Sequence, residues 1–315
     1  MEVWKLPNGL RVIYKRKPGN SVSIEVLVDV GSNDESPAAR GVSHFIEHMV
    51  FEGTEKRPSA KEIANAVESL GGDINAYTTN TRTCFYAKVL KKHFGVALDV
   101  ISDILQRPII RTGDIERQRG ILSREIDMVM DEPRFYQWIL FQKTLFKVHP
   151  VRFPTYGSHQ SVAKISKAAI EKHFKRFYRP EGMVVCVVGD VPGARGLVGK
   201  AFSSKIRGRA THKPENEPMQ KKLRIVREKR NIGNTYFVLG YRTVPRLHPD
   251  SYTLDVIDAV LGRGQSGWLF DEVRNRHGLA YDVGTQHIAE RDYGYFAAYA
   301  SAEKKNVENH TNQNL

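Results

Sequence analysis

The chain has 315 residues, 41% of them hydrophobic and 10% aromatic, which excludes a disordered chain and allows two medium-sized domains. Its net charge of +13 is compatible with nucleic-acid binding, but no nucleic-acid-binding motif accompanies the charge. No run of eighteen apolar residues occurs and the N-terminus lacks the plan of a signal peptide, so we expect a cytoplasmic protein without a membrane partner.

The first half of the chain predicts strands that alternate with helices. Residues 3–14 form an expected hairpin with Pro7-Asn8-Gly9 as its turn, and residues 22–30 form an expected strand. A helix should follow, capped at Ser36 before Pro37 and ended by Gly53. Further helices are expected at 59–70, 92–106, 112–130 and most of 138–178, and extended segments at 73–89 and 183–188. Cys84 and Cys186 lie in strand-like segments and are expected to be core residues.

The second half predicts a smaller domain after a basic linker. Residues 200–230 hold eleven basic and three acidic side chains together with Gly and Pro, so a solvated linker is favoured over a nucleic-acid patch. Strands are then expected at 223–227, 235–241 and 293–300, and a helix at 251–261. This order resembles a shortened first domain, and the polar segment after residue 303 suggests that the second domain is incomplete.

The predicted fold class is therefore α+β. Each of two similar domains should contain an antiparallel or mixed sheet with helices packed on it. The expected boundaries are a first domain at 1–200, the basic linker at 201–219 and the second domain at 220–315.

The strongest chemical signal is the H-x-x-E-H pattern formed by His44, Glu47 and His48. Residues three and four apart on a helix share a face, so the two imidazoles can bind one ion with the carboxylate beside them. Zinc held by two histidines commonly takes a third protein ligand and keeps one position for water, whose proton an adjacent Glu can accept. The alternative is a pair of ordinary surface histidines.

The sequence resembles the pitrilysin/insulinase family of zinc metallopeptidases, the inverzincins, particularly the small branch of mitochondrial processing peptidase-like proteins. The resemblance covers nearly the whole chain. It is carried by the segments LPNGLRV, GVSHFIEHMVFEGT, LGGDINAYT, SREIDMVMDEP, YRPEGMVVCVVGDV and LFDEVRNRHGLAYDV.

The resemblance implies a zinc-dependent endopeptidase with one Zn²⁺ per chain. His44, His48 and Glu125 would bind the metal, the last because it lies 77 positions after His48, and Glu47 would be the general base. The family usually has a second Glu seven residues before the third ligand, but this chain has Gln118. Gln118 can donate and accept hydrogen bonds but adds no charge, so an altered metal affinity or a lower activity is expected.

The resemblance also implies residues that handle an extended peptide substrate. Asn75 and Ala76 match a segment that pairs with the substrate as an added strand, although Thr81 stands where the family commonly has an acid. Arg274 and Tyr281 match residues that would fix the substrate backbone and stabilise an oxyanion. The alternatives are that Asn75 is an ordinary turn residue, that Arg274 is a surface residue and that Tyr281 is a core residue.

The family encloses its substrate in a chamber of four similar domains, so a two-domain chain is expected to form a homodimer or to pair with a related subunit. No nucleic-acid partner is expected. The leading alternative is a non-catalytic scaffold or partner subunit, or an inactive truncated relative. A third reading, in which the basic linker binds nucleic acid, predicts affinity that falls steeply with salt.

Overall fold

The computed structural model describes residues 1–212 and 215–303. The chain forms two compact units, and each takes residues from both halves of the sequence. Unit 1 comprises Met1–Ile126 and Pro154–Lys213, and unit 2 comprises Asp127–Phe153 and Pro214–Leu315. Residues 127–153 thus group with the second unit. The expected boundaries, 1–200 and 220–315, had assigned these residues to the first domain.

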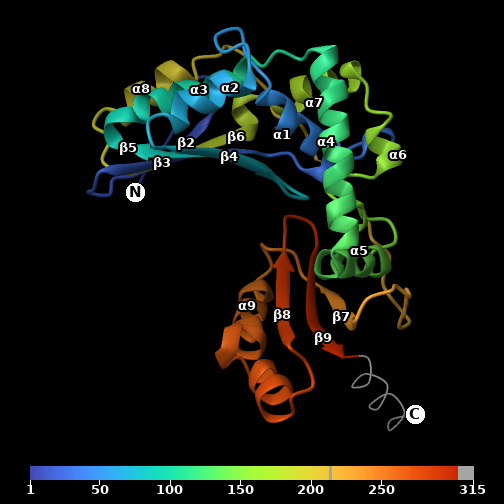
Figure 1. The fold of residues 1–315 in the computed structure, drawn as a ribbon. Coiled ribbons are helices and arrows are strands. Elements are labelled where there is room, and N and C mark those ends of the chain that lie inside the picture. Colours follow the sequence, from blue (N-terminus) through green and yellow to red (C-terminus); the bar gives the residue numbers. More distant parts are fainter. Residues whose placement is uncertain (213–214, 304–315) are drawn as a thin grey trace. The chain divides into compact units, whose positions relative to one another are not determined.

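Unit 1 contains a six-stranded sheet in the order β1-β2-β6-β3-β5-β4 (Figure 1). Neighbouring strands are antiparallel except for β2 and β6, which are parallel, so the predicted mixed sheet is confirmed. The strands are β1 (Glu2–Lys5), β2 (Arg11–Lys15), β3 (Ser21–Val28), β4 (Asp73–Thr78), β5 (Thr83–Leu90) and β6 (Met183–Val188). Strand β4 lies at one edge, and β5 is its only partner among the described strands.

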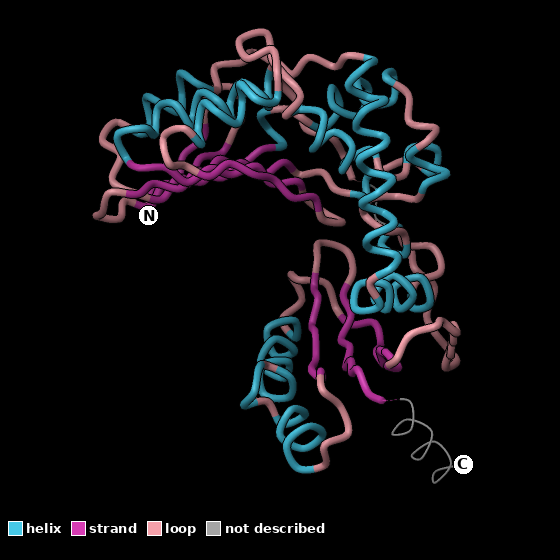
Figure 2. The backbone as a smooth tube through the Cα atoms, viewed as in Figure 1, coloured by secondary structure: helices cyan, strands magenta, loops and turns pink. Residues whose placement is uncertain are grey.

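The helices of unit 1 lie on one face of this sheet (Figure 2). They are α1 (Val42–Val50), α2 (Ala60–Glu68), α3 (Phe94–Gln106), α4 (Thr112–Asp131), α6 (His159–Val162), α7 (Lys167–Phe177) and α8 (Ala194–Ala201). Alternate side chains of a strand point to opposite faces, so Val22, Ile24 and Val26 of β3 are buried whereas Glu25 is exposed. Strand β6 shows the same alternation in burial, although its sequence is wholly apolar.

Helix α1 begins later than the sequence suggested. Pro37–Ala39 forms a separate 3-10 turn, and Gly41, not Ser36, precedes the first helical residue. Gly41 has φ of 92°, and a Cβ there would lie 2.8 Å from the carbonyl oxygen of Tyr156. Both the backbone angle and the close approach therefore require glycine at this position.

The carboxylate of Glu35 caps the start of α1. It accepts hydrogen bonds from the backbone N–H groups of Gly41 at 2.7 Å and Ser43 at 2.8 Å, and its side chain is buried. Two of the N–H groups that a helix start leaves unpaired are thus satisfied by one distant side chain. The histidine-bearing helix is fixed at its first turn.

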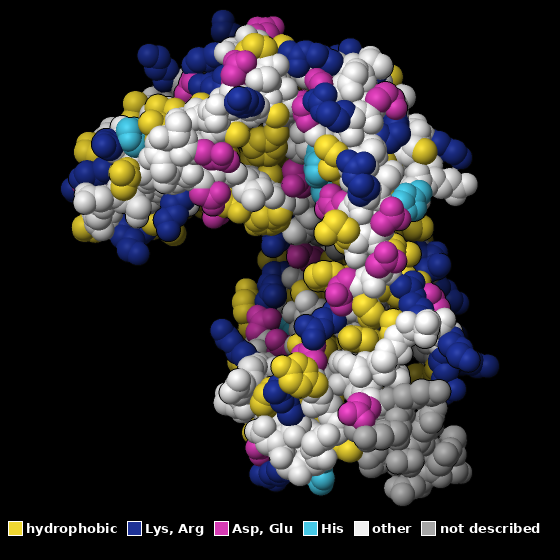
Figure 3. Space-filling view, viewed as in Figure 1, with side chains coloured by type: hydrophobic (Ala, Val, Ile, Leu, Met, Phe, Trp, Pro, Cys, Tyr) yellow, Lys and Arg dark blue, Asp and Glu magenta, His cyan; other side chains and the backbone are white. Residues whose placement is uncertain are grey.

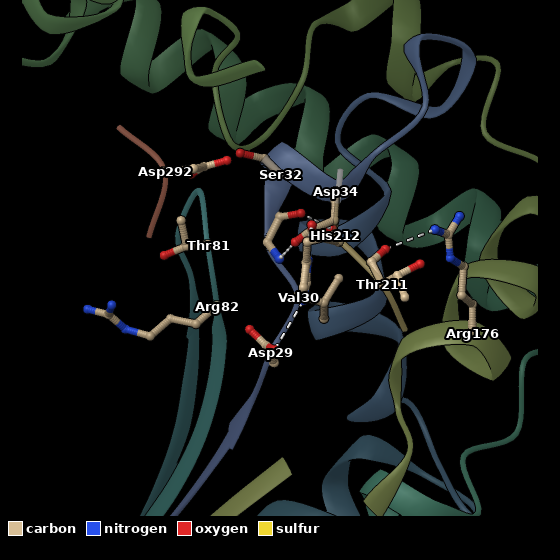
Figure 4. A network of polar contacts seen from close by, with 12 residues as sticks. Asp29, Val30, Ser32, Asp34, Thr81, Arg82, Arg176, Thr211, His212 and Asp292 are labelled. Atoms are coloured by element: carbon tan, nitrogen blue, oxygen red, sulfur yellow. Dashed lines mark hydrogen bonds and ion pairs between the residues drawn. The ribbon is translucent and has the colours of Figure 1, made fainter. Parts of the chain in front are cut away.

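The first part of the predicted linker is attached to unit 1. The imidazole of His212 lies between the carboxylates of Asp29 and Asp34, with Nε2 3.1 Å from Asp29 and Nδ1 hydrogen-bonded to Asp34 (Figure 4). Arg209 also donates to Asp29. The hydrogen bonds with Asp29 and Asp34 raise the pKa of His212 to about 9. Residues up to His212 are therefore bound to the unit rather than freely solvated.

Unit 2 contains a three-stranded antiparallel sheet in the order β7-β9-β8. Its elements are α5 (Pro133–Leu145), β7 (Asn234–Thr243), α9 (Asp250–Gly262), the π-type turn η7 (Phe270–Arg276), β8 (Asp282–Ala289) and β9 (Gly294–Glu303). Phe141 and Leu145 of α5 pack with Tyr293 and Tyr295 in one apolar cluster, which explains why this early helix belongs to unit 2. The order matches β3-β5-β4 of unit 1, as expected for related domains.

Two details of the sequence prediction for unit 2 were wrong. Residues 223–227 alternate like a strand but form none, whereas strand β8 was not predicted. The helix expected at 251–261 and the strands expected at 235–241 and 293–300 are present.

Three general properties follow from the described residues. Cys84 and Cys186 are both free thiols. None of the described helices is both long enough and apolar enough to cross a membrane. Lys and Arg side chains are spread over the face shown in Figure 3 and do not gather into one patch there.

Candidate metal centre

The structure brings His44, His48 and Glu125 together within unit 1. One ligand atom from each residue lies within 4.8 Å of the others, and no other such cluster of three occurs among the described residues. The two carboxylate oxygens of Glu125, on α4, face one imidazole each: Oε1 lies 3.5 Å from His44 Nε2 and Oε2 lies 3.6 Å from His48 Nε2. The rings of the two histidines meet edge to face, with centroids 4.8 Å apart.

This donor set fits zinc. Ligands about 2.1 Å from a tetrahedral zinc ion are about 3.4 Å from one another, which is close to the separations between Glu125 and the two imidazoles. Two nitrogen donors and one carboxylate are also the ligand types of hydrolytic zinc sites, which leave a fourth position open. Burial, with the neighbouring charge of His48, lowers the pKa of His44 to about 3, so this imidazole is neutral, as a metal ligand must be.

Glu47 lies on α1 between the two histidines and is buried at 9% exposure. Burial raises the pKa of its carboxyl, and a hydrogen bond from the hydroxyl of Thr78 opposes this effect. Thr78 is the last residue of the edge strand β4, and its hydroxyl donates to Glu47 Oε2. The candidate base is therefore fixed in place by the strand that was expected to bind substrate.

A series of hydrogen-bonded side chains extends from Nδ1 of His48. Its Nδ1 lies 3.0 Å from Gln118 Oε1, and Gln118 Nε2 donates to the carboxylate of Glu52. The other oxygen of Glu52 accepts from the guanidinium of Arg117, which also binds Asp114. Gln118 and Glu52 are both buried, at 7% and 6% exposure, so the contacts next to His48 lie inside the protein, whereas the side chain of Arg117 reaches the surface.

Tyr156 is the other aromatic neighbour of the cluster. Its ring centroid is 6.4 Å from that of His44, and burial with the nearby charge of Glu125 raises its pKa to about 12. Its hydroxyl is therefore protonated at neutral pH. Within the described residues, Nδ1 of His44 has no hydrogen-bond partner, in contrast to Nδ1 of His48.

Asn75 and Ala76 lie on the edge strand β4, three and two residues before Thr78. Asn75 is exposed, and its side-chain oxygen accepts a 2.8 Å hydrogen bond from the N–H of Ala76. The structure thus places both residues on a strand whose outer edge has no partner among the described strands, close in sequence to the residue that holds Glu47.

Arg274 and Tyr281 belong to unit 2, where they contact each other. The guanidinium donates to the carbonyl oxygen of Tyr281 at 2.8 Å and lies 4.4 Å from the centroid of its ring. Tyr281 is 69% exposed, so the alternative of a core tyrosine does not hold. The role of this pair toward the metal cluster of unit 1 stays a prediction.

Sequence reasoning missed four residues of this centre: Glu35, Glu52, Thr78 and Tyr156. Two of them carried a usable signal. Glu52 follows His48 by four residues, a helical spacing, and Thr78 follows Ala76 by two, which places both on one face of the strand. Glu35 caps the helix of the two histidines and Tyr156 lies beside His44; both contacts depend on the tertiary fold, and no local spacing indicates them.

The fold and the cluster define a class: an α+β protein of two related units with a His-His-Glu centre and an adjacent Glu, as in zinc metallopeptidases. Comparison with known families agrees. Residues 11–158 match the model described as "Insulinase (Peptidase family M16)", and residues 164–313 match "Peptidase M16 inactive domain".

Individual relatives extend this match along the chain. An uncharacterized zinc protease of Mycobacterium tuberculosis is 36% identical over 302 residues, which cover 94% of this chain and 69% of the relative. The uncharacterized zinc protease YmxG of Bacillus subtilis is 32% identical over 295 residues, with 93% and 71% covered. The crystal structure of a protease from Helicobacter pylori superimposes with a TM-score of 0.90 at 25% identity and covers 96% of this chain and 75% of that one. The chain therefore belongs to the insulinase family, peptidase family M16.

Proposed function

We propose that this chain is a zinc-dependent endopeptidase that cleaves extended peptides. The observation that carries the proposal is the position of Glu47: it directly precedes His48 on the helix that also carries His44, and its carboxylate is held by Thr78 of the edge strand. Zinc bound by His44, His48 and Glu125 would lower the pKa of a water and polarise the carbonyl that the water attacks.

The protein's own groups would handle the proton. The carboxylate of Glu47 accepts a proton from the attacking water and passes it to the departing amine of the cleaved peptide. Burial supports this exchange because it moves the pKa of Glu47 upward, toward neutral pH. The hydroxyl of Thr78 fixes one carboxylate oxygen and leaves the other for the water.

The edge of β4 is the proposed substrate platform. An extended peptide can add to an unpaired strand edge through main-chain hydrogen bonds. The N–H of Ala76 is bonded to the side chain of Asn75, a contact that a substrate carbonyl could replace. Arg274 and Tyr281, by resemblance to the family, would bind the substrate backbone and the developing oxyanion.

The test is Glu47→Gln, which removes the base but keeps all three proposed ligands. We expect peptide hydrolysis to fall at least about 100-fold, because general-base catalysis contributes about 10²- to 10⁴-fold, while about one zinc stays bound per chain. Cleavage of an unstructured fluorogenic peptide and metal analysis of the same sample provide the two measurements.

Glu68→Gln is the matched control, because it neutralises an exposed Glu on α2 that is not part of the cluster. It should cleave like the wild type. If Glu47→Gln cleaves as fast as the wild type, the proposed mechanism is wrong. A wild-type chain that binds zinc but cleaves no peptide would instead support a non-catalytic subunit of the family.

A further inference from the structure

Gln118 stands where the family usually has a charged Glu, yet in the structure it connects His48 to a carboxylate. Its amide lies between Nδ1 of His48 and the side chain of Glu52. Glu52 lies two residues after the end of α1, while Gln118 lies on α4, so the connection joins α4 to the turn that follows α1. The carboxylate that Gln118 lacks is thus supplied by Glu52, one hydrogen bond further from His48.

The carboxylate dictates the orientation of the amide. Glu52 is paired with Arg117 and has only acceptor atoms to offer, so the NH₂ group of Gln118 must face it. The carbonyl oxygen of Gln118 must then face His48. The reversed amide would place oxygen against carboxylate and leave two buried groups without donors.

The amide in turn dictates the tautomer of His48. A carbonyl oxygen can only accept, so Nδ1 must carry the hydrogen and Nε2 is left with its free electron pair. Nε2 is the atom that faces Glu125, at 3.6 Å. We propose that Glu52 is a positioning residue, which acts through Gln118 to hold His48 in the tautomer that binds the metal. This inference depends on the proposed zinc centre.

The test removes the carboxylate from position 52 and, in a second variant, also places a carboxylate at position 118. Glu52→Gln should weaken zinc binding about 10- to 100-fold, the usual cost of losing a partner behind a metal-binding histidine. Gln118→Glu alone places two carboxylates against each other. The exchanged double variant Glu52→Gln/Gln118→Glu puts the carboxylate directly on Nδ1, so it should restore zinc affinity to within a few-fold of the wild type. Affinity is measured by competition with a chromophoric chelator.

A purely structural role of Glu52 would not predict rescue by the exchanged pair. Glu116→Gln is the control, because it removes an exposed charge from α4, the helix that carries Gln118. This variant should bind zinc like the wild type. If Glu52→Gln binds zinc normally, or if the exchanged variant is as weak as Glu52→Gln, the inference is wrong.

The tautomer can also be observed in the metal-free protein. Ring nitrogen NMR shifts, with the His48 signal identified by its loss in His48→Gln, should show Nδ1–H in the wild type and in the exchanged variant, and a mixture in Glu52→Gln. A mixture in the wild type would contradict the inference. Because neither readout involves peptide cleavage, a chain that binds zinc without hydrolysis would overturn the proposed function but leave this inference standing.

Discussion

Glu35 supports the metal centre without touching it. Its carboxylate satisfies two N–H groups in the first turn of α1, and one of these belongs to Ser43, the residue before His44. Helix starts otherwise leave such donors unpaired, and a buried unpaired donor costs about 1–3 kcal/mol. The geometry of the helix that carries both histidines therefore depends on a side chain nine residues before His44.

Glu35→Ala should lower the free energy of unfolding by about 2–4 kcal/mol, because two buried N–H groups lose their acceptor. Urea denaturation of the metal-free protein at neutral pH measures the change. Glu68→Gln should leave the midpoint within error. A Glu35→Ala protein as stable as the wild type would mean that other groups can cap α1.

At the level of single residues, the sequence predicted what is local. His44, Glu47 and His48 were found because five consecutive residues of one helix carry the whole pattern, whereas Glu125 needed the spacing of a known family. Thr78 contacts Glu47 across 31 residues of sequence. Glu52 contacts Gln118 across 66 residues. A single sequence does not specify which strand end meets which helix.

Among the elements, the segment that leaves unit 1 is held by a titratable contact. His212 is stabilised as a cation between Asp29 and Asp34, so its pKa is raised from 6.5 to about 9. A raised pKa of this kind contributes stability that is fully present below pH 6.5 and is lost as the pH rises through 9. The attachment of residues 207–212 should therefore weaken in alkaline solution.

We expect His212→Gln to destabilise unit 1 by about 1–2 kcal/mol at pH 6 and to have a smaller effect at pH 10. The measurement is the difference in unfolding free energy between wild type and variant at the two pH values, which cancels the titration of other groups. A difference that does not change with pH would exclude His212 as the titrating group.

The errors in the predicted elements have three different causes. Strand β8 contains Gly284, Gln286 and His287, so its composition did not suggest a strand, and its pairing with β9 makes it one. Residues 223–227 have the opposite character, with alternating apolar side chains but no strand partner among the described residues. Helix α1 was predicted five residues too early because the Ser-Pro signal at 36 belongs to a separate turn.

For the whole molecule, the prediction of a homodimer can be tested by complementation. If Tyr281 of one chain serves the zinc of another, then a mixture of Glu47→Gln and Tyr281→Phe chains contains dimers with one intact site. Half of the dimers are mixed and each has one good site of two, so roughly a quarter of wild-type activity should return.

The mixture must be refolded or exchanged together, and each variant alone provides the baseline. Activity that stays at the sum of the two separate variants would show that Tyr281 does not act across chains. Size measurement of the same sample then separates a monomer from a dimer whose sites are each built within one chain.

Helix α4 is shared between the two units: the division falls after Ile126, and the helix continues to Asp131. Glu125, a proposed ligand, is the last residue but one on the unit 1 side. Because linkage is reciprocal, any free energy by which zinc stabilises the end of this helix is also the free energy by which a change at residues 127–131 alters zinc affinity. Under that condition, a change in zinc affinity and a change in the stability of residues 127–131 are two measures of one coupling free energy.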